Sequence, residues 1–136
     1  MIVVDASAIA HSLLRLPGAA AVDRRISAAS ADMHAPHILE IEVANVLRKF
    51  ALRGLIDGSR GALALEMMRD FGIKLYPHSA TLPRVWALRH NVSAYDAAYV
   101  ALAELLDAPL LTCDGRLAME IGHHATVEII KADENF

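Results

Sequence analysis

The sequence predicts an α/β domain built on a mainly parallel sheet that is flanked by helices. Two observations favour this fold. Short apolar runs, as at residues 2–4, alternate with longer stretches in which apolar residues recur every three or four positions. The short runs are typical of buried strands and the longer stretches of amphipathic helices. Strands that alternate with helices usually pair in parallel through right-handed crossovers.

The first half of the chain has clear start and stop signals. Pro17-Gly18 ends the first helix, Pro36 closes the second strand, and Gly54 ends a long helix. In order, we expect a strand at 2–4, helices at 6–16 and 19–30, a strand at 33–35, and helices at 37–53 and 59–71. The long helix has the clearest apolar stripe, which consists of Val43, Val46, Leu47, Phe50 and Ala51.

The second half repeats the alternation with shorter elements. In order, we expect a strand at 73–76, helices at 81–90 and 94–106, a strand at 109–112, a short helix at 115–121 and a strand at 127–130. Spacing predicts a buried face on two helices. The residues concerned are Leu63, Met67 and Phe71 on one, and Tyr95, Tyr99, Leu102 and Leu106 on the other. We expect one domain at 1–130 and a short tail at 131–136.

Composition limits the class of protein. The 136 residues fit one domain, and 55% of them are hydrophobic, which favours either an apolar interface or an alanine-rich core about equally. The net charge of −3, without a run of Lys or Arg, argues against a nucleic-acid partner held by a basic patch alone. Cys113 is the single cysteine, so no internal disulfide can form. We expect a cytoplasmic protein, because no membrane-length apolar stretch or signal peptide is seen.

Four acids occupy the strand ends and helices of this predicted fold. Asp5 and Asp114 each come directly after an apolar run, and Glu42 and Asp96 lie on two of the helices. In an open parallel sheet, groups beyond the carboxyl ends of the strands converge on one crevice. Carboxylates gathered there repel one another unless a positive group lies between them, and a hard divalent cation with oxygen ligands is the simplest such group. The pattern therefore predicts a metal site.

Each acid also has an ordinary explanation, which is favoured for any one of them taken alone. Asp5 can cap the following helix, Asp114 can turn the chain, Asp96 can be a first-turn acid, and Glu42 can be a solvated helix residue. Three nearby polar residues fit a role in orienting the carboxylates: Ser7, Thr112 and Asn45. The alternative is that they are ordinary strand or helix residues. The two interpretations are equally favoured for Ser7 and Thr112, and the ordinary one is favoured for Asn45.

At four places the chain resembles the motifs of PIN-domain nucleases. The matching segments are, in order, VVDASA at 3–8, EVANVL at 42–47, AYDAAYVALA at 94–103 and LTCDGRL at 111–117. Their order, their spacing and the total length resemble the VapC-like toxins of bacterial and archaeal toxin–antitoxin pairs. One such motif would be weak, whereas four in order cover nearly the whole chain.

The resemblance implies an endoribonuclease that hydrolyses RNA phosphodiester bonds with Mg²⁺ or Mn²⁺ and acts as a toxin. It implies that Asp5, Asp96 and Asp114 bind the metal, and that Glu42 either binds it or orients the attacking water. It further implies a cognate antitoxin protein and a toxin homodimer. The candidates for contact with the RNA backbone are Arg48, Lys49 and Arg116, for each of which solvated surface is the commoner role. The alternatives are an RNA-processing nuclease without an antitoxin and a non-catalytic Mg²⁺-binding interaction domain.

Overall fold

The computed structural model describes residues 1–131 and confirms the α/β prediction. In these residues five strands form one sheet in the order β3-β2-β1-β4-β5, and every neighbouring pair is parallel. The sheet is therefore wholly parallel within this range, where the sequence predicted a mainly parallel one. The strands are β1 (Ile2–Val4), β2 (Met33–Pro36), β3 (Lys74–Tyr76), β4 (Leu110–Thr112) and β5 (Val127–Ile129).

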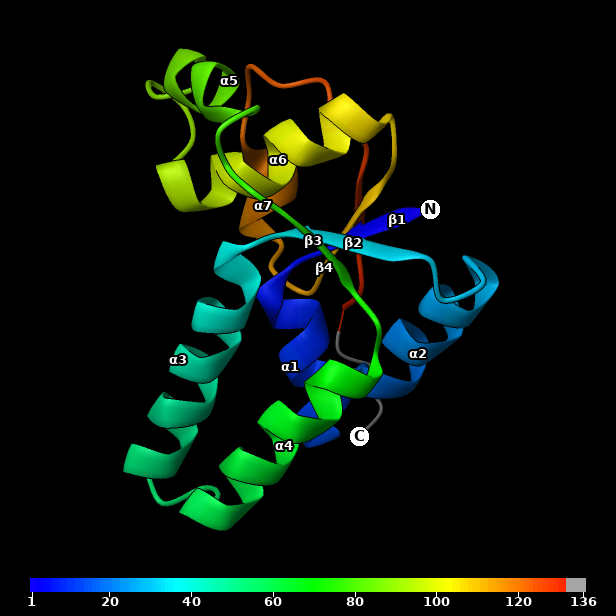
Figure 1. Ribbon diagram of the computed structural model, residues 1–136, viewed down its shortest axis with the longest axis vertical. Helices are drawn as coiled ribbons and strands as arrows, with labels where there is room; N and C mark the ends of the chain where they lie inside the picture. The colour runs from blue at the N-terminus through cyan, green and yellow to red at the C-terminus, as the bar shows by residue number, and fades with distance from the viewer. Residues whose placement is uncertain (132–136) are drawn as a thin grey trace.

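Helices cover both faces of the sheet. In Figure 1, α1 to α4 lie on one side of the strands, and α5 and α6 lie on the other. Helix α1 contacts α2, α3 and α4, whereas α6 contacts α5 and the strands β1, β2 and β4. Within residues 1–131 the helices are α1 (Ala6–Leu14), α2 (Ala19–Ala28), α3 (Ile38–Leu52), α4 (Gly58–Asp70), α5 (Leu82–Ala87), α6 (Ala94–Leu106) and α7 (Arg116–Met119).

Most element boundaries fall within two residues of those expected, and β1 and α6 agree at both ends. Helix α1 stops at Leu14 because Arg15 adopts a left-handed conformation (φ 54°), and its N–H bonds to carbonyls of the last turn. Helix α5 was predicted to run to residue 90 but ends at Ala87. The chain turns there because the N–H groups of Asn91 and Val92 both bond to the Leu88 carbonyl.

Two predicted buried faces were partly wrong. On α4, Leu63 and Met67 are 50% and 40% exposed, while Ala64 and Met68 are buried. The small Ala64 lets α4 pack closely against its neighbours α1 and α3, so the buried face is rotated by one residue from the predicted one. On α6, Tyr95 is exposed at the start of the helix, although the other predicted face residues are buried or partly buried.

The strand order reverses between β1 and β4, and this is the feature that positions a site. Chain connections leave β1 towards β2 on one side and reach β4 on the other. Open parallel sheets bind ligands outside the carboxyl ends of two such strands, and we call this region of the molecule the crevice. Asp5 directly follows β1, and Asp114 lies two residues beyond β4. Both strands are fully buried, so the backbone that carries these acids is held by the core.

Two further expectations concern the outside of the domain. None of the helices in residues 1–131 is long and apolar enough to cross a membrane. The predicted tail at 131–136 lies outside the described residues except for Lys131.

Candidate active site

Asp5 is the most enclosed of the four predicted acids. Its side chain is 5% exposed and caps α1. Its Oδ1 accepts hydrogen bonds from the Ala8 N–H at 3.0 Å and from the Ser7 hydroxyl at 2.7 Å. Its Oδ2 accepts a hydrogen bond from the Thr112 hydroxyl at 2.5 Å. The capping role and a role in a site are thus combined, and three donors fix the carboxylate in one orientation.

The environment of Asp5 disfavours its charge despite these donors. Burial raises the pKa of Asp5, and the hydrogen bonds from Thr112, Ala8 and Ser7 lower it by less than burial raises it. The negative charge of Asp114 raises the pKa of Asp5 further. A cation near Asp5 would therefore restore a charged state that the protein alone disfavours.

Ser7 and Thr112 join the ends of β1 and β4 across the crevice. The Ser7 hydroxyl lies 3.2 Å from that of Thr112 and accepts a hydrogen bond from the Cys113 N–H at 2.9 Å. Thr112 also accepts a hydrogen bond from the Asp114 N–H at 2.9 Å. Thr112 thus donates its hydroxyl proton to the Asp5 carboxylate, while its hydroxyl oxygen accepts from the Asp114 backbone.

Glu42 enters the same crevice from α3. It accepts a hydrogen bond from the Tyr99 hydroxyl of α6 at 2.5 Å. Burial raises the pKa of Glu42, and the charges of Asp5 and Asp96 raise it further. Burial and the contact with Glu42 raise the pKa of Tyr99 far above its usual value, so this hydroxyl remains a donor.

Sequence reasoning assigned Tyr99 to the core and missed this contact. The signal was its spacing, because Tyr99 lies three residues after Asp96 and therefore faces the same side of α6.

Asp96 and Asp114 are bridged by Arg116. The Arg116 Nη2 lies 3.0 Å from Asp114 Oδ2 and 3.4 Å from Asp96 Oδ2. The Arg116 N–H also donates to Asp114 Oδ1 at 3.0 Å, so both oxygens of Asp114 have a donor. The nearby carboxylates, Asp96 first and Asp114 second, raise the pKa of Arg116. These two acids therefore share a positive group that belongs to the chain itself.

A fifth acid, Glu120, also lies at this site and was missed by sequence reasoning. Burial and the neighbouring Asp96 carboxyl group raise the pKa of Glu120 to about 7. Its Oε2 is buried without a hydrogen-bond partner among the described residues. No local pattern signals it, because Glu120 follows α7 with an extended backbone conformation (ψ 137°).

The other predicted candidates do not join the cluster. Asn45, Arg48 and Lys49 are exposed on α3, with no hydrogen bond to the acids in the part of the chain that the structure describes. In residues 1–131 no group of three or more His, Cys, Asp or Glu side chains is spaced to hold a metal ion. The Arg116 bridge gives a physical reason, because it fills the gap between two of the acids.

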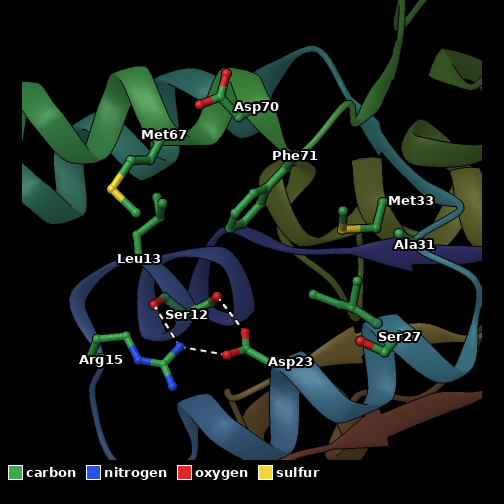
Figure 2. Close-up of a pocket in the computed structure, with 11 residues that line it drawn as sticks. Ser12, Leu13, Arg15, Asp23, Ser27, Ala31, Met33, Met67, Asp70 and Phe71 are labelled. Atoms are coloured by element: carbon green, nitrogen blue, oxygen red, sulfur yellow. Dashed lines mark hydrogen bonds and ion pairs between the residues drawn. The ribbon is translucent and has the colours of Figure 1, made fainter.

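A separate cleft lies between α1, α2 and α4, and Figure 2 shows its lining. Its walls are apolar, with Leu13, Met67 and Phe71 on one side. At its rim Asp23 accepts hydrogen bonds from Ser12 and from Arg15. None of the four predicted acids lines it, and Arg15 at its rim is paired with Asp23. The acid-lined crevice is therefore the stronger candidate for chemistry.

Comparison with known proteins identifies relatives over nearly the whole chain. The PIN domain model matches residues 2–119, a range that contains all four predicted acids but not Glu120. Ribonuclease VapC12 of Mycobacterium tuberculosis is 38% identical over 130 residues, which are 96% of this chain and 99% of that protein. Ribonuclease VapC9 of the same organism is 43% identical over 118 residues, covering 87% of this chain and 89% of that protein. The crystal structure of PAE2754 from Pyrobaculum aerophilum is 25% identical, with a TM-score of 0.67, and covers 94% of this chain and 83% of that one.

Proposed function

The chain belongs to the PIN domain family, and from that premise we propose that it is the endoribonuclease toxin of a VapC-type toxin–antitoxin pair. It hydrolyses RNA phosphodiester bonds with the help of Mg²⁺ or Mn²⁺. The observation that supports this most is the crevice at the β1–β4 reversal, where the charges of Asp5 and Asp96 raise the pKa of Glu42. The PIN domain model matches residues 2–119, which carry these acids.

The donor set fits a hard divalent cation. Every candidate ligand is a carboxylate oxygen, and Mg²⁺ needs only one or two protein carboxylates because it keeps several waters. Glu120 Oε2 is a buried oxygen without a partner in residues 1–131. We propose Asp5, Asp96 and Asp114 as the residues that hold the cation. When bound, the cation supplies charge neutralisation at the scissile phosphate and lowers the pKa of a nearby water.

The protein side chains supply orientation and proton handling. Ser7 and Thr112 fix the Asp5 carboxylate by donating to both of its oxygens. Tyr99 holds Glu42 by one oxygen, which leaves the other oxygen to accept a proton from an attacking water. The raised pKa of Glu42 suits this role, because a base with a pKa nearer neutrality holds an accepted proton better.

We propose RNA, a cognate antitoxin and a second copy of the chain as partners, and the cytoplasm as the place of action. Arg48 and Lys49 are exposed on α3 and can contact an RNA backbone. Trp86 is 69% exposed, so it is not a core residue, and its exposed ring supports an interface with a protein partner. Other large apolar side chains are also exposed and support a protein partner, among them Ile41, Leu52, Leu55, Leu82, Met119 and Ile121. The catalytic unit is proposed to span residues 1–130.

The direct test is RNA cleavage by the purified protein with Mg²⁺, with Mn²⁺ and with a chelator. We expect cleavage only with a divalent cation, and cleavage by Asp5→Asn that is lower by on the order of 10³-fold. Brief expression followed by mapping of new RNA ends would identify the target. Cation binding without cleavage of any RNA would favour a non-catalytic binding domain. Cleavage without growth arrest on expression would favour an RNA-processing nuclease.

A further inference from the structure

Arg116 lies where a cation between Asp96 and Asp114 would have to lie. One guanidinium nitrogen, Nη2, is within 3.4 Å of an oxygen of each acid. The two acids come from different elements, since Asp96 is in the first turn of α6 and Asp114 follows β4. A single nitrogen therefore joins two parts of the chain that are distant in sequence.

The bridge also occupies the oxygens that a metal would need. Asp114 Oδ1 accepts a hydrogen bond from the Arg116 N–H, and its Oδ2 pairs with the guanidinium. Asp96 Oδ2 forms the ion pair with Arg116 Nη2. A divalent cation can bind these carboxylates through the same oxygens only if the guanidinium moves away.

The Arg116 side chain can exchange its partners for water or for other ions, because it is largely exposed. Its side chain is 68% exposed, and the helix that begins with it, α7, has four residues. Exposed ion pairs are weak because solvent screens them and because long side chains lose freedom in forming them. Asp5, by contrast, is buried and held by three donors. The two sides of the crevice thus differ in how easily their contacts exchange.

We propose that Arg116 is an internal counter-ion that takes the place of the divalent cation in the metal-free protein, so that Arg116 and the cation compete for Asp96 and Asp114. This inference rests on the proposed function, because it concerns the same acids. Arg116 lowers the repulsion between the acids before metal binds. It also reduces the free energy of metal binding by the free energy of the ion pairs that the metal must break. It is a positioning residue for the site and sets the cation concentration at which the site fills.

The experiment measures Mn²⁺ affinity by titration calorimetry and thermal stability in chelator. The variants are Arg116→Gln, Arg116→Lys and the control Arg53→Gln. Arg53 is exposed at the far end of α3 and has no ion pair in the described residues, so its replacement removes the same charge away from the acids. Circular dichroism checks that each variant is folded.

We expect Arg116→Gln to bind Mn²⁺ about 3- to 10-fold more tightly than the parent, as the loss of two exposed ion pairs permits. Its melting temperature in chelator should fall, because Asp96 and Asp114 then repel without a partner. Arg116→Lys should lie between these values, and Arg53→Gln should match the parent in both measurements.

Two results separate this inference from the function on which it rests. Equal Mn²⁺ affinity in Arg116→Gln and Arg53→Gln, or weaker binding in Arg116→Gln, would overturn the competition. Weaker RNA binding with unchanged Mn²⁺ affinity would make Arg116 an RNA contact instead, and would also overturn it. An absence of Mn²⁺ binding in every protein, the parent included, would overturn the proposed metal site itself.

Discussion

The two sides of the acid-lined crevice are built differently. On the inner side, Asp5 is buried at the end of β1 and receives hydrogen bonds from Ser7, Ala8 and Thr112. On the outer side, Asp96 and Asp114 are held together by the exposed Arg116. The inner side belongs to the core of the fold, whereas the outer side depends on a short helix and an exchangeable ion pair. A site with one fixed and one adjustable wall can keep its geometry while its occupant changes.

The largest effect on activity is expected when Asp5, on the inner side of the crevice, is replaced. Asp5→Asn should lower cleavage by on the order of 10³-fold, because it removes the charge that the inner side presents to the cation. The metal-free variant should be at least as stable as the parent, because Asn retains an acceptor for the helix cap and removes a buried charge. Cleavage of a labelled RNA and melting in chelator would measure both. Unchanged cleavage would show that Asp5 is not part of the site. Marked unfolding would show that its role is to cap the helix.

On the outer side of the crevice, replacement of Asp114 should cause a comparable loss of activity and leave the protein folded. Asp114→Ala should abolish the growth arrest that we expect on expression of the parent alone. Its structural cost is limited to a local turn, on the order of 0.5–2 kcal/mol for a lost cap. The measurement is growth after induction at matched protein levels. Arrest that persists in this variant would indicate toxicity by aggregation, and the comparison of the two walls would then lose its functional meaning.

A smaller effect is expected when a support of Asp5 is removed and Asp5 itself is retained. Thr112→Val keeps the shape of this fully buried side chain and removes the hydroxyl that donates to Asp5. Loss of a group that orients a metal ligand typically costs about 10–100-fold in affinity or activity. Mn²⁺ titration and RNA cleavage would report it, with the exposed Thr126→Val as the matched control. Equal values in the two variants would show that the inner wall does not depend on this hydrogen bond.

Cation binding should raise the melting temperature, and acids on both sides of the crevice should contribute to this shift. A ligand that binds only the folded state at about 100 times its Kd contributes about 2.7 kcal/mol, which is a shift of several degrees for a domain of this size. The shift should shrink in Asp96→Asn and Asp114→Asn and nearly vanish in Asp5→Asn. Scanning calorimetry with and without Mn²⁺ would measure it. An equal shift in the parent and all three variants would mean that the cation binds elsewhere on the chain.

The smallest effect concerns pH and the outer wall. Glu120 has its pKa raised to about 7 in the folded protein, from a reference value of 4.5. The folded state therefore holds more protons than the unfolded state between these values, and this contribution to stability is lost as pH rises towards 7. Between pH 5 and pH 8 in chelator, Glu120→Gln should lose about 1 kcal/mol less unfolding free energy than the parent after solvent screening. Its melting temperature should therefore fall less over this range. A pH profile identical to that of the parent would contradict this role of Glu120.

Much of the fold could be predicted because its signals are local. The apolar strands before Asp5 and Asp114 and the Pro and Gly stops define most elements within a few residues. The parallel order then brings the carboxyl ends of β1 and β4 together, as topology requires. The predicted face of α4 was wrong because the pattern followed the large apolar residues and ignored Ala64, which is buried while Leu63 is exposed.

The contacts that hold the acids could not be predicted from spacing alone. Thr112 bonds to Asp5 across more than a hundred residues of sequence, and Tyr99 reaches Glu42 from another helix. Both pairings depend on how α6 and β4 lie against β1, which no local pattern specifies. Arg116 and Glu120 could be listed as charged residues near Asp114. Their orientation towards Asp96 follows from the short α7, whose direction is set by tertiary packing.

The pairing of β1 with β4 also has a consequence during protein synthesis. Asp5 is made more than a hundred residues before Thr112 and Asp114. At about 5–20 residues per second, a ribosome needs on the order of ten seconds to travel between them. During that interval the nascent chain carries its first acid without the hydroxyl that orients it or the acids that would share a cation. A chain of this kind cannot cleave the messenger on which it is being translated until β4 has emerged and docked beside β1.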